Sequence, residues 1–158
     1  MNNLLNIIYY ICLNYPNNED LSNARLNKII YLADWRNVLR RGRQVSNINW
    51  VFNHYGPFVF DIIDEVNAHE NIFEVKCIAN DFGAPKQIIS LKGGLNQVNT
   101  NIEDSDSIDF IIEKTKDMGF NKFIQYVYST YPVLSSQHGE ALNLLEKAEE
   151  YRTNKQQD

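Results

Sequence analysis

The stretch from Arg25 to Arg41, RLNKIIYLADWRNVLRR, constrains the fold more than any other part of this 158-residue chain. Its apolar residues recur at helical spacing and form two adjacent stripes. A helix that is apolar around most of its girth must be surrounded by other elements. We therefore expect a central, buried helix over residues 23–40, with Ser22 capping its start and Gly42 ending it.

The rest of the chain alternates between helical and extended patterns. Predicted helices cover residues 3–14, 57–69, 105–118, 120–130 and 137–152, and predicted strands cover residues 48–53, 72–78 and 87–91. Pro57 suits the first turn of its helix, and Gly83 and Pro85 suit a hairpin between the last two strands. The sequence predicts a single α+β domain over residues 1–158, dominated by helices, with a frayed polar tail at 153–158. The short strand and the hairpin are expected to form a small antiparallel sheet.

Composition narrows the classes of function. The formal net charge is -5 at pH 7, which disfavours non-specific binding to nucleic acid or to an anionic membrane. The apolar segment from Leu4 to Leu13 is too short to span a bilayer, which takes ~20 residues, and it lacks the features of a signal peptide. We expect a cytoplasmic protein in which Cys12 and Cys77 are buried thiols, with a disulfide between them as the alternative.

No arrangement of residues typical of catalysis is found. His54, His69 and His138 do not have the spacing of metal ligands. Gly93-Gly94 follows a strand but lacks the further glycine and the lysine of a phosphate loop. The acidic residues of the predicted helix 57–69 are most simply a solvated face rather than an acid–base pair. We expect neither enzymatic activity nor a metal or cofactor.

Two charged clusters of opposite sign indicate a protein partner instead. Such surfaces raise the rate and specificity of association. The basic cluster lies at the end of the central helix, where cations also suit the helix dipole, and that simpler role is the alternative. The candidate contact residues are Arg36, Arg40, Arg41 and Arg43 in the basic cluster, and Asp61, Asp64 and Glu65 in the acidic one.

Aromatic residues near these clusters are candidate anchors for binding, although aromatics at helical or strand spacing are more often core residues. The candidates are Tyr31, Trp35, Trp50 and Tyr55. Asp34 is unusual because an acid inside an apolar helix is costly to bury without a partner. We expect it to be paired with Arg36, with Arg43 or with the amides near Tyr55-Gly56. Exposure to solvent and contact with a partner are the alternatives.

Two segments together resemble the SocA-like antitoxin family, which carries the Panacea domain. RLNKIIYLADW at 25–35 is similar to the family's helix with a Lys/Arg-Leu-x-Lys-hydrophobic-hydrophobic-Tyr start, and HYGPFV at 54–59 is similar to its Tyr-Gly-Pro turn. The resemblance covers about residues 20–70. It implies a non-catalytic protein that neutralises a cognate toxin or effector by direct binding or, in some members, by presenting the toxin to a protease.

Two other functions stay open at this point. Residues 25–91 could form a degenerate winged helix of a DNA-binding regulator, with 57–69 as the inserted helix and 72–91 as the wing. However, residues 44–75 contain no Lys or Arg and five acidic residues, which would repel phosphate. The third possibility is a phage-borne inhibitor of a host defence protein. The sequence gives neither the partner nor the oligomeric state.

Overall fold

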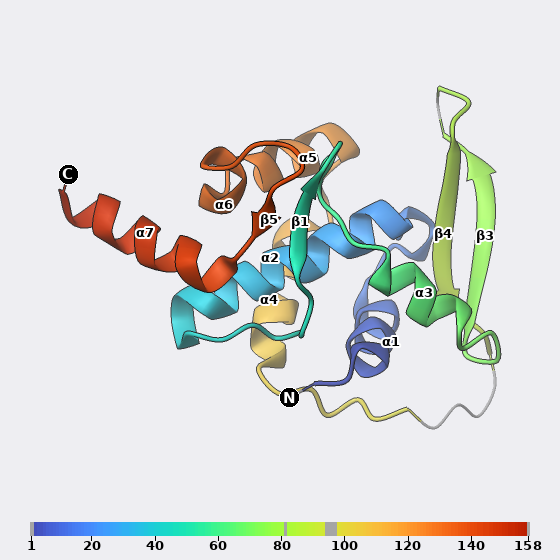
Figure 1. Ribbon diagram of the computed structural model, residues 1–158. Helices are drawn as coiled ribbons and strands as arrows, with labels where there is room; N and C mark the ends of the chain where they lie inside the picture. The colour runs from blue at the N-terminus through green and yellow to red at the C-terminus, as the bar shows by residue number, and fades with distance from the viewer. Residues whose placement is uncertain (1, 81, 94–97, 158) are drawn as a thin grey trace.

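The computed structural model describes residues 2–80, 82–93 and 98–157, and it confirms a helix-dominated α+β fold (Figure 1). The long helix α2 (Asn23–Arg41) crosses the middle of the molecule and the other elements pack around it. The other helices are α1 (Leu4–Asn14), α3 (Asp61–Asn67), α4 (Ser105–Thr115), α5 (Phe120–Tyr128), α6 (Tyr131–Leu134) and α7 (Leu144–Gln157), with a 3-10 turn at Asn18–Asp20. Among the described residues, no helix combines the length and apolar character needed to cross a bilayer.

Helix α2 begins and ends where the sequence predicts. The Ser22 side chain accepts a hydrogen bond from the Arg25 amide, and Gly42 ends the helix in the left-handed region at φ 75°. Fourteen of its 19 residues are buried, because the two apolar stripes together cover most of the helix surface and both pack against other elements. The helix is therefore the core around which the domain is built.

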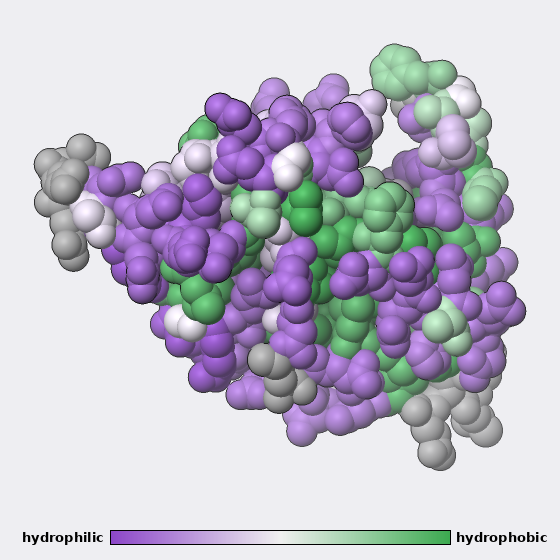
Figure 2. Space-filling model, viewed as in Figure 1, coloured by the Kyte–Doolittle hydropathy of each residue, from purple (hydrophilic) through white to green (hydrophobic). Residues whose placement is uncertain are grey.

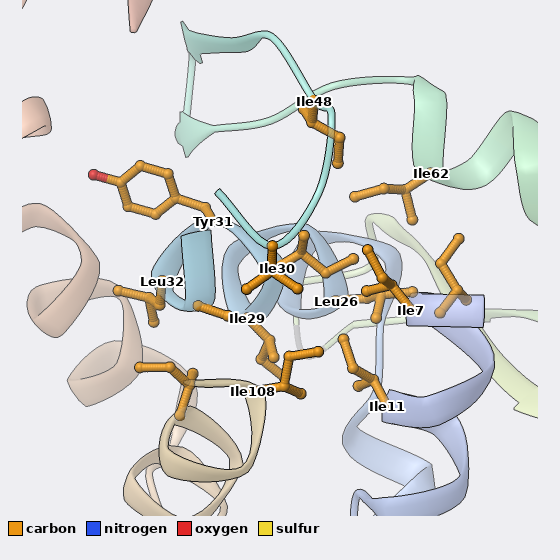
Figure 3. Close-up of a cluster of buried hydrophobic side chains, with 14 of the residues drawn as sticks. Ile7, Ile11, Leu26, Ile29, Ile30, Tyr31, Leu32, Ile48, Ile62 and Ile108 are labelled. Carbon is orange, nitrogen blue, oxygen red and sulfur yellow. The ribbon is translucent and has the colours of Figure 1, made fainter. Parts of the chain in front are cut away.

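The centre of the core is made by aliphatic side chains from α1, α2, α4 and the segments that follow α2 (Figure 3). Ile7 and Ile11 of α1 point toward Leu26 and Ile30 of α2, and Ile108 approaches from α4. Each of these five side chains is at most 1% exposed. Burial of a side chain of this size contributes roughly 1.5–3 kcal/mol before entropy is counted.

The strands form two separate antiparallel sheets. One has the order β2-β1-β5, built from β1 (Trp50–Asn53), β2 (Gly56–Pro57) and β5 (Ala141–Leu142). The other is the hairpin of β3 (Phe73–Ala79) and β4 (Pro85–Leu91). The predicted short strand and hairpin both exist, but they do not share a sheet, because β1 pairs with the chain's distant segment 141–142 instead.

Two predicted helix starts are wrong for the same reason. Pro57 does not open a helix: with Gly56 it returns along β1, opposite Phe52 and Asn53, and α3 begins only at Asp61. The last helix begins at Leu144 rather than at residue 137, because residues 141–142 pair with β1. In both places backbone pairing with β1 replaced the local helical preference.

The two cysteines are both free thiols, but only Cys12 is buried as predicted. Cys77 is exposed because it lies on β3, the outer strand of the two-stranded sheet. Burial raises the pKa of the Cys12 thiol to about 12, so this cysteine is protonated and unreactive at neutral pH.

Candidate partner-binding surface

Asp34 is held inside the protein by the loop that follows α2. Its side chain is 0% exposed. Its Oδ1 accepts hydrogen bonds from the amides of Val45 (2.8 Å) and Ser46 (2.9 Å), and Oδ2 accepts one from the Trp50 indole (2.9 Å). The Ser46 hydroxyl and the Gln44 side-chain amide also donate to Oδ2. The carboxylate therefore fixes the path of residues 42–49 and the start of β1.

This finding corrects the expected partners of Asp34. Neither Arg36, Arg43 nor the amides near Tyr55-Gly56 contact it, because the loop after α2 folds back first and offers its own amides. Burial raises the pKa of Asp34 to about 6, although the hydrogen bonds from Ser46, Trp50 and Val45 oppose the rise. In this arrangement Asp34 is a structural residue, out of reach of a partner.

Arg41 and Arg43 are occupied by carboxylates at the start of α4. Arg43 Nε lies 2.8 Å from Asp104 Oδ2, and Arg41 Nη2 lies 2.8 Å from Asp106 Oδ2. The Arg43 hydrogen bond is the main reason why the pKa of Asp104 is below its ordinary value. These two arginines join the end of α2 to the start of α4. Their role in the fold is therefore structural, which was the alternative to partner contact.

Arg36 and Arg40 instead line a cleft, which we call the cationic cleft. The cleft has a volume of about 220 Å³. Its walls come from α2, α4, α5 and the residues just after α5, and they consist of Leu32, Trp35, Arg36, Leu39, Arg40, Phe110, Ile111, Tyr126 and Thr130. Within the described chain, neither Arg36 nor Arg40 forms an ion pair with a carboxylate.

The chemistry of the cleft combines unpaired cations with aromatic rings. The Arg36 guanidinium lies 3.5 Å from the centre of the Phe110 ring, a cation–π contact. The buried Nε of Arg36 has no acceptor among the described residues. Desolvation and the nearby Arg40 both lower the pKa of Arg36. An incoming carboxylate would offset this repulsion through the accessible part of the two guanidinium groups, whereas the Nε itself is buried.

The aromatic candidates of α2 lie mainly in the core. Tyr31 is 0% exposed, and its hydroxyl is 2.8 Å from Thr130 Oγ1. The prediction that Tyr31 contacts a partner is therefore wrong, because the side chain lies in the core. Its ring also packs edge-on against Trp50, with 5.6 Å between centroids. Trp35 is 7% exposed and packs edge-on against Tyr151, but it also forms part of the cleft wall.

The acidic cluster and Tyr55 lie apart from the cationic cleft. Helix α3 lies beside the N-terminal part of α2, whereas Arg36 and Arg40 belong to its C-terminal part (Figure 1). On α3, Asp61 and Asp64 are exposed, and Glu65 is half-buried beside His69. Tyr55 is 80% exposed at the tip of the β1–β2 turn. The structure thus brings Trp35, Arg36 and Arg40 together and leaves the other exposed candidates on another side.

The two sequence segments that suggested a family contact each other directly. Asn27 Oδ1 accepts a hydrogen bond of 2.9 Å from the Val59 amide. Gly56 has a φ of +104°, and a Cβ there would lie 3.6 Å from Lys28 Cε. The helix segment and the Tyr-Gly-Pro turn are therefore one packed unit. Sequence reasoning missed Asn27 and Lys28, and the available signal was their place among the buried residues of α2.

Comparison with known proteins decides the family. The family model described as "Antitoxin SocA-like, Panacea domain" matches residues 26–132. This chain belongs to that family. The match begins in α2 and ends in α6, so it includes the packed unit above and every wall of the cationic cleft. No curated protein and no solved structure matches the chain.

The resemblance inferred from the residues is thus confirmed, and it places the chain in a family of antitoxins. In the part of this Panacea-family chain that the structure describes, no group of three or more His, Cys, Asp or Glu side chains could hold a metal ion. The cleft offers two cations and three aromatic rings beside aliphatic side chains and Thr130, and arginine and aromatic residues are frequent at protein–protein contacts.

Proposed function

We propose that this protein is a non-catalytic antitoxin that binds and neutralises a cognate protein toxin, and that the cationic cleft is part of the contact surface. Membership of the SocA-like family supports the antitoxin role. One observation supports the cleft. Arg36 and Arg40 have no carboxylate partner in the described chain, whereas Arg41 and Arg43 beside them are paired with the start of α4.

The size and lining of the cleft suit a side chain of a protein better than a small substrate. At about 220 Å³ it is smaller than most ligand pockets, which hold about 300–1,000 Å³. Tryptophan, tyrosine and arginine are the residues most enriched at binding hot spots. The toxin would supply an acidic residue to Arg36 and Arg40 and an apolar one to the surface near Phe110.

The experiment is co-expression with the product of the gene next to this one. We expect that product to stop growth alone, and we expect this chain to restore growth and to co-purify with it. The double variant Arg36→Glu/Arg40→Glu should weaken binding at least about 30-fold, since a hot-spot change costs about 2 kcal/mol or more. The matched control, Lys122→Glu/Lys155→Glu, makes the same charge change at two exposed lysines outside the cleft.

The outcomes separate the two parts of the proposal. If the neighbouring product is not toxic, or if this chain neither rescues growth nor binds it, the antitoxin function is wrong. If the double variant rescues as well as the control, the function stands and the cleft is not the contact surface. Immunoblotting of the toxin distinguishes two modes of neutralisation. A sequestered toxin persists in rescued cells, whereas a toxin delivered to a protease disappears.

A further inference from the structure

The hairpin β3–β4 projects from the body of the protein, with β4 on the inner side and β3 outermost (Figure 1). The last four residues of β3, from Lys76 to Ala79, are all exposed. Ile78 is 39% exposed, and Phe82, just beyond the end of β3, is 96% exposed. Figure 2 shows apolar side chains at this tip, standing clear of the body. Exposed apolar side chains that lie close together mark binding surfaces more often than isolated ones do, and Ile78 and Phe82 both lie at this end of the hairpin.

The register of the hairpin identifies which backbone groups of β3 face outward. The Lys92 amide donates to the Ile72 carbonyl (2.8 Å) at one end of the ladder, and the Asn80 amide donates to the Ala84 carbonyl (2.8 Å) at the other. Because bonded and non-bonded pairs alternate in an antiparallel ladder, the even-numbered residues of β3 bond to β4. The odd-numbered residues direct their N–H and C=O groups to the open edge.

Three amides on that edge have no partner among the residues that the structure describes. The Phe73 amide donates to the His69 carbonyl (3.1 Å). Beyond it, the amides of Val75, Cys77 and Ala79 form no hydrogen bond with any part of the chain that the structure describes. The open edge therefore presents a regular row of donors and acceptors, which another strand would match.

The opposite edge of the hairpin, on β4, offers fewer free amides than the β3 edge. On β4, Pro85 has no N–H to offer, and the Ile89 amide donates to the Leu21 carbonyl (3.0 Å). Proteins usually protect open edges with proline, bulges or inward-pointing charges. The seven consecutive pairs of β3 contain neither a proline nor a bulge on the β3 side. The protection on β3 is thus limited to the exposed charges of Glu74 and Lys76.

We propose that the open edge of β3 takes up an extended segment of the partner protein, which adds a third strand to the hairpin. In this mode of recognition main-chain hydrogen bonds supply affinity, and alternate side chains supply specificity. A two-stranded hairpin is marginally stable alone, so a third strand would also stabilise the projecting half. The exposed Ile78 and Phe82 would contact apolar residues of the added strand. The proposal rests on the proposed function only for the identity of the partner.

The first test uses a display library of twelve-residue peptides, selected on the immobilised protein. Cys77→Pro removes an outward amide while leaving the ladder bonds of its neighbours in place, and Cys77→Ser keeps that amide. We expect selected peptides to bind the wild-type protein and Cys77→Ser alike, and Cys77→Pro at least about tenfold more weakly, as loss of one or two hydrogen bonds implies.

A second variant keeps the test valid if Cys77→Pro fails to fold. Ala79→Pro mirrors the natural Pro85, which stands opposite it in the ladder, so the hairpin should tolerate it. Circular dichroism and thermal unfolding check both variants. The proposal is wrong if no peptide binds, or if neither Cys77→Pro nor Ala79→Pro weakens the binding of the selected peptides.

Hydrogen exchange then locates the added strand. In complexes with a selected peptide, and with the neighbouring gene product, exchange at Val75, Cys77 and Ala79 should slow at least about tenfold. Unchanged exchange in the toxin complex would overturn the edge proposal while leaving the antitoxin function intact. Peptide binding at the edge without any toxin complex would support the edge as a strand-binding site and overturn the antitoxin function. If the free protein dimerises through this edge and Ala79→Pro makes it monomeric, the occupant is a second copy and the proposal is overturned.

Discussion

Two buried charges on α2, Asp34 and Lys28, are treated by the fold in opposite ways. They lie six residues apart, and their side chains are 0% and 1% exposed. Asp34 accepts hydrogen bonds from four residues of the following segment. Lys28 forms no hydrogen bond or ion pair in the described chain, and its ammonium lies 5.9 Å from the centre of the Phe58 ring. The same helix therefore holds one compensated charge and one uncompensated charge.

Desolvation pushes both groups toward their neutral forms. It raises the pKa of Asp34 to about 6 and lowers the pKa of Lys28 to about 8. The difference lies in what each charge accomplishes. The carboxylate of Asp34 organises a loop, whereas Lys28 contributes its aliphatic stem, which packs against Gly56. The comparison indicates that Asp34 stabilises the fold and that the Lys28 ammonium does not.

The largest expected effect is that of Asp34→Ala. Its removal leaves the Trp50 indole, the Ser46 hydroxyl and two amides without an acceptor inside the protein. We expect a loss of about 3–5 kcal/mol in the free energy of unfolding at pH 7, as for other broken buried polar clusters. Urea unfolding measures it. Asp61→Ala, on an exposed acid of α3, is the control and should change stability by less than about 0.5 kcal/mol. Equal losses in the two variants would contradict the role of Asp34.

The pH dependence of Asp34 provides the second test. Its folded pKa of about 6 lies above the ordinary value of 3.8, so the folded protein binds this proton more tightly. The associated stability is fully present below about pH 3.8 and is lost as the pH rises to about 6. Relative to Asp34→Asn, which does not titrate, the wild-type protein should lose about 3 kcal/mol over that interval. A difference that is flat with pH would show that the carboxylate is not desolvated.

Lys28→Met should stabilise the protein, the opposite direction to the Asp34 variants. Methionine keeps the length of the stem and removes a largely desolvated ammonium that has no hydrogen-bond partner in the described chain, so we expect a gain of about 2 kcal/mol at pH 7. Since the folded pKa of about 8 lies below the ordinary 10.5, the wild-type protein gains stability as the pH rises from 8. The advantage of Lys28→Met should therefore shrink by pH 10. If the variant is instead destabilised, the ammonium has a partner and the comparison fails.

Local sequence signals were sufficient for the elements that local interactions determine. The apolar stripes, Ser22 and Gly42 predicted α2 to within one residue at its end, because capping and periodicity act over a few positions. The β1–β5 pair could not be predicted in this way. Trp50 lies opposite Leu142, and nothing near either residue specifies the other. The missed start of α3 and the late start of α7 both follow from this sheet. The end of α7 was also missed, because the helix continues to Gln157 through residues predicted to be a frayed tail.

The sequence could identify the candidate residues that lie on α2, but it could not show which of them pair with residues of other helices. The sequence identified Trp35, Arg36 and Arg40 as residues to examine, since all three lie on α2. It gave no means to tell Arg40 from Arg41. That distinction depends on Asp106 of α4, which pairs with Arg41 and leaves Arg40 beside the cleft. Charge clusters can be read from sequence, but which charges remain unpaired is decided by tertiary packing.

The smallest expected effect is a difference of about 1 kcal/mol between two glycine variants, one of them in the turn that covers Lys28. Gly56→Ala places a side chain at a φ of +104°, and its Cβ would lie 3.2 Å from Tyr128 and 3.6 Å from Lys28. Gly42→Ala is the matched control, because Gly42 has a φ of +75° and open space around its Cβ position. We expect a loss of about 1 kcal/mol for Gly42→Ala from the backbone alone and about 2 kcal/mol for Gly56→Ala, measured by urea unfolding. The excess reports how tightly the turn packs on the Tyr128 ring of α5, because the 3.6 Å distance to Lys28 is an ordinary van der Waals contact. Equal losses would mean that the Tyr128 ring moves aside at no cost and that the turn rests loosely on α5.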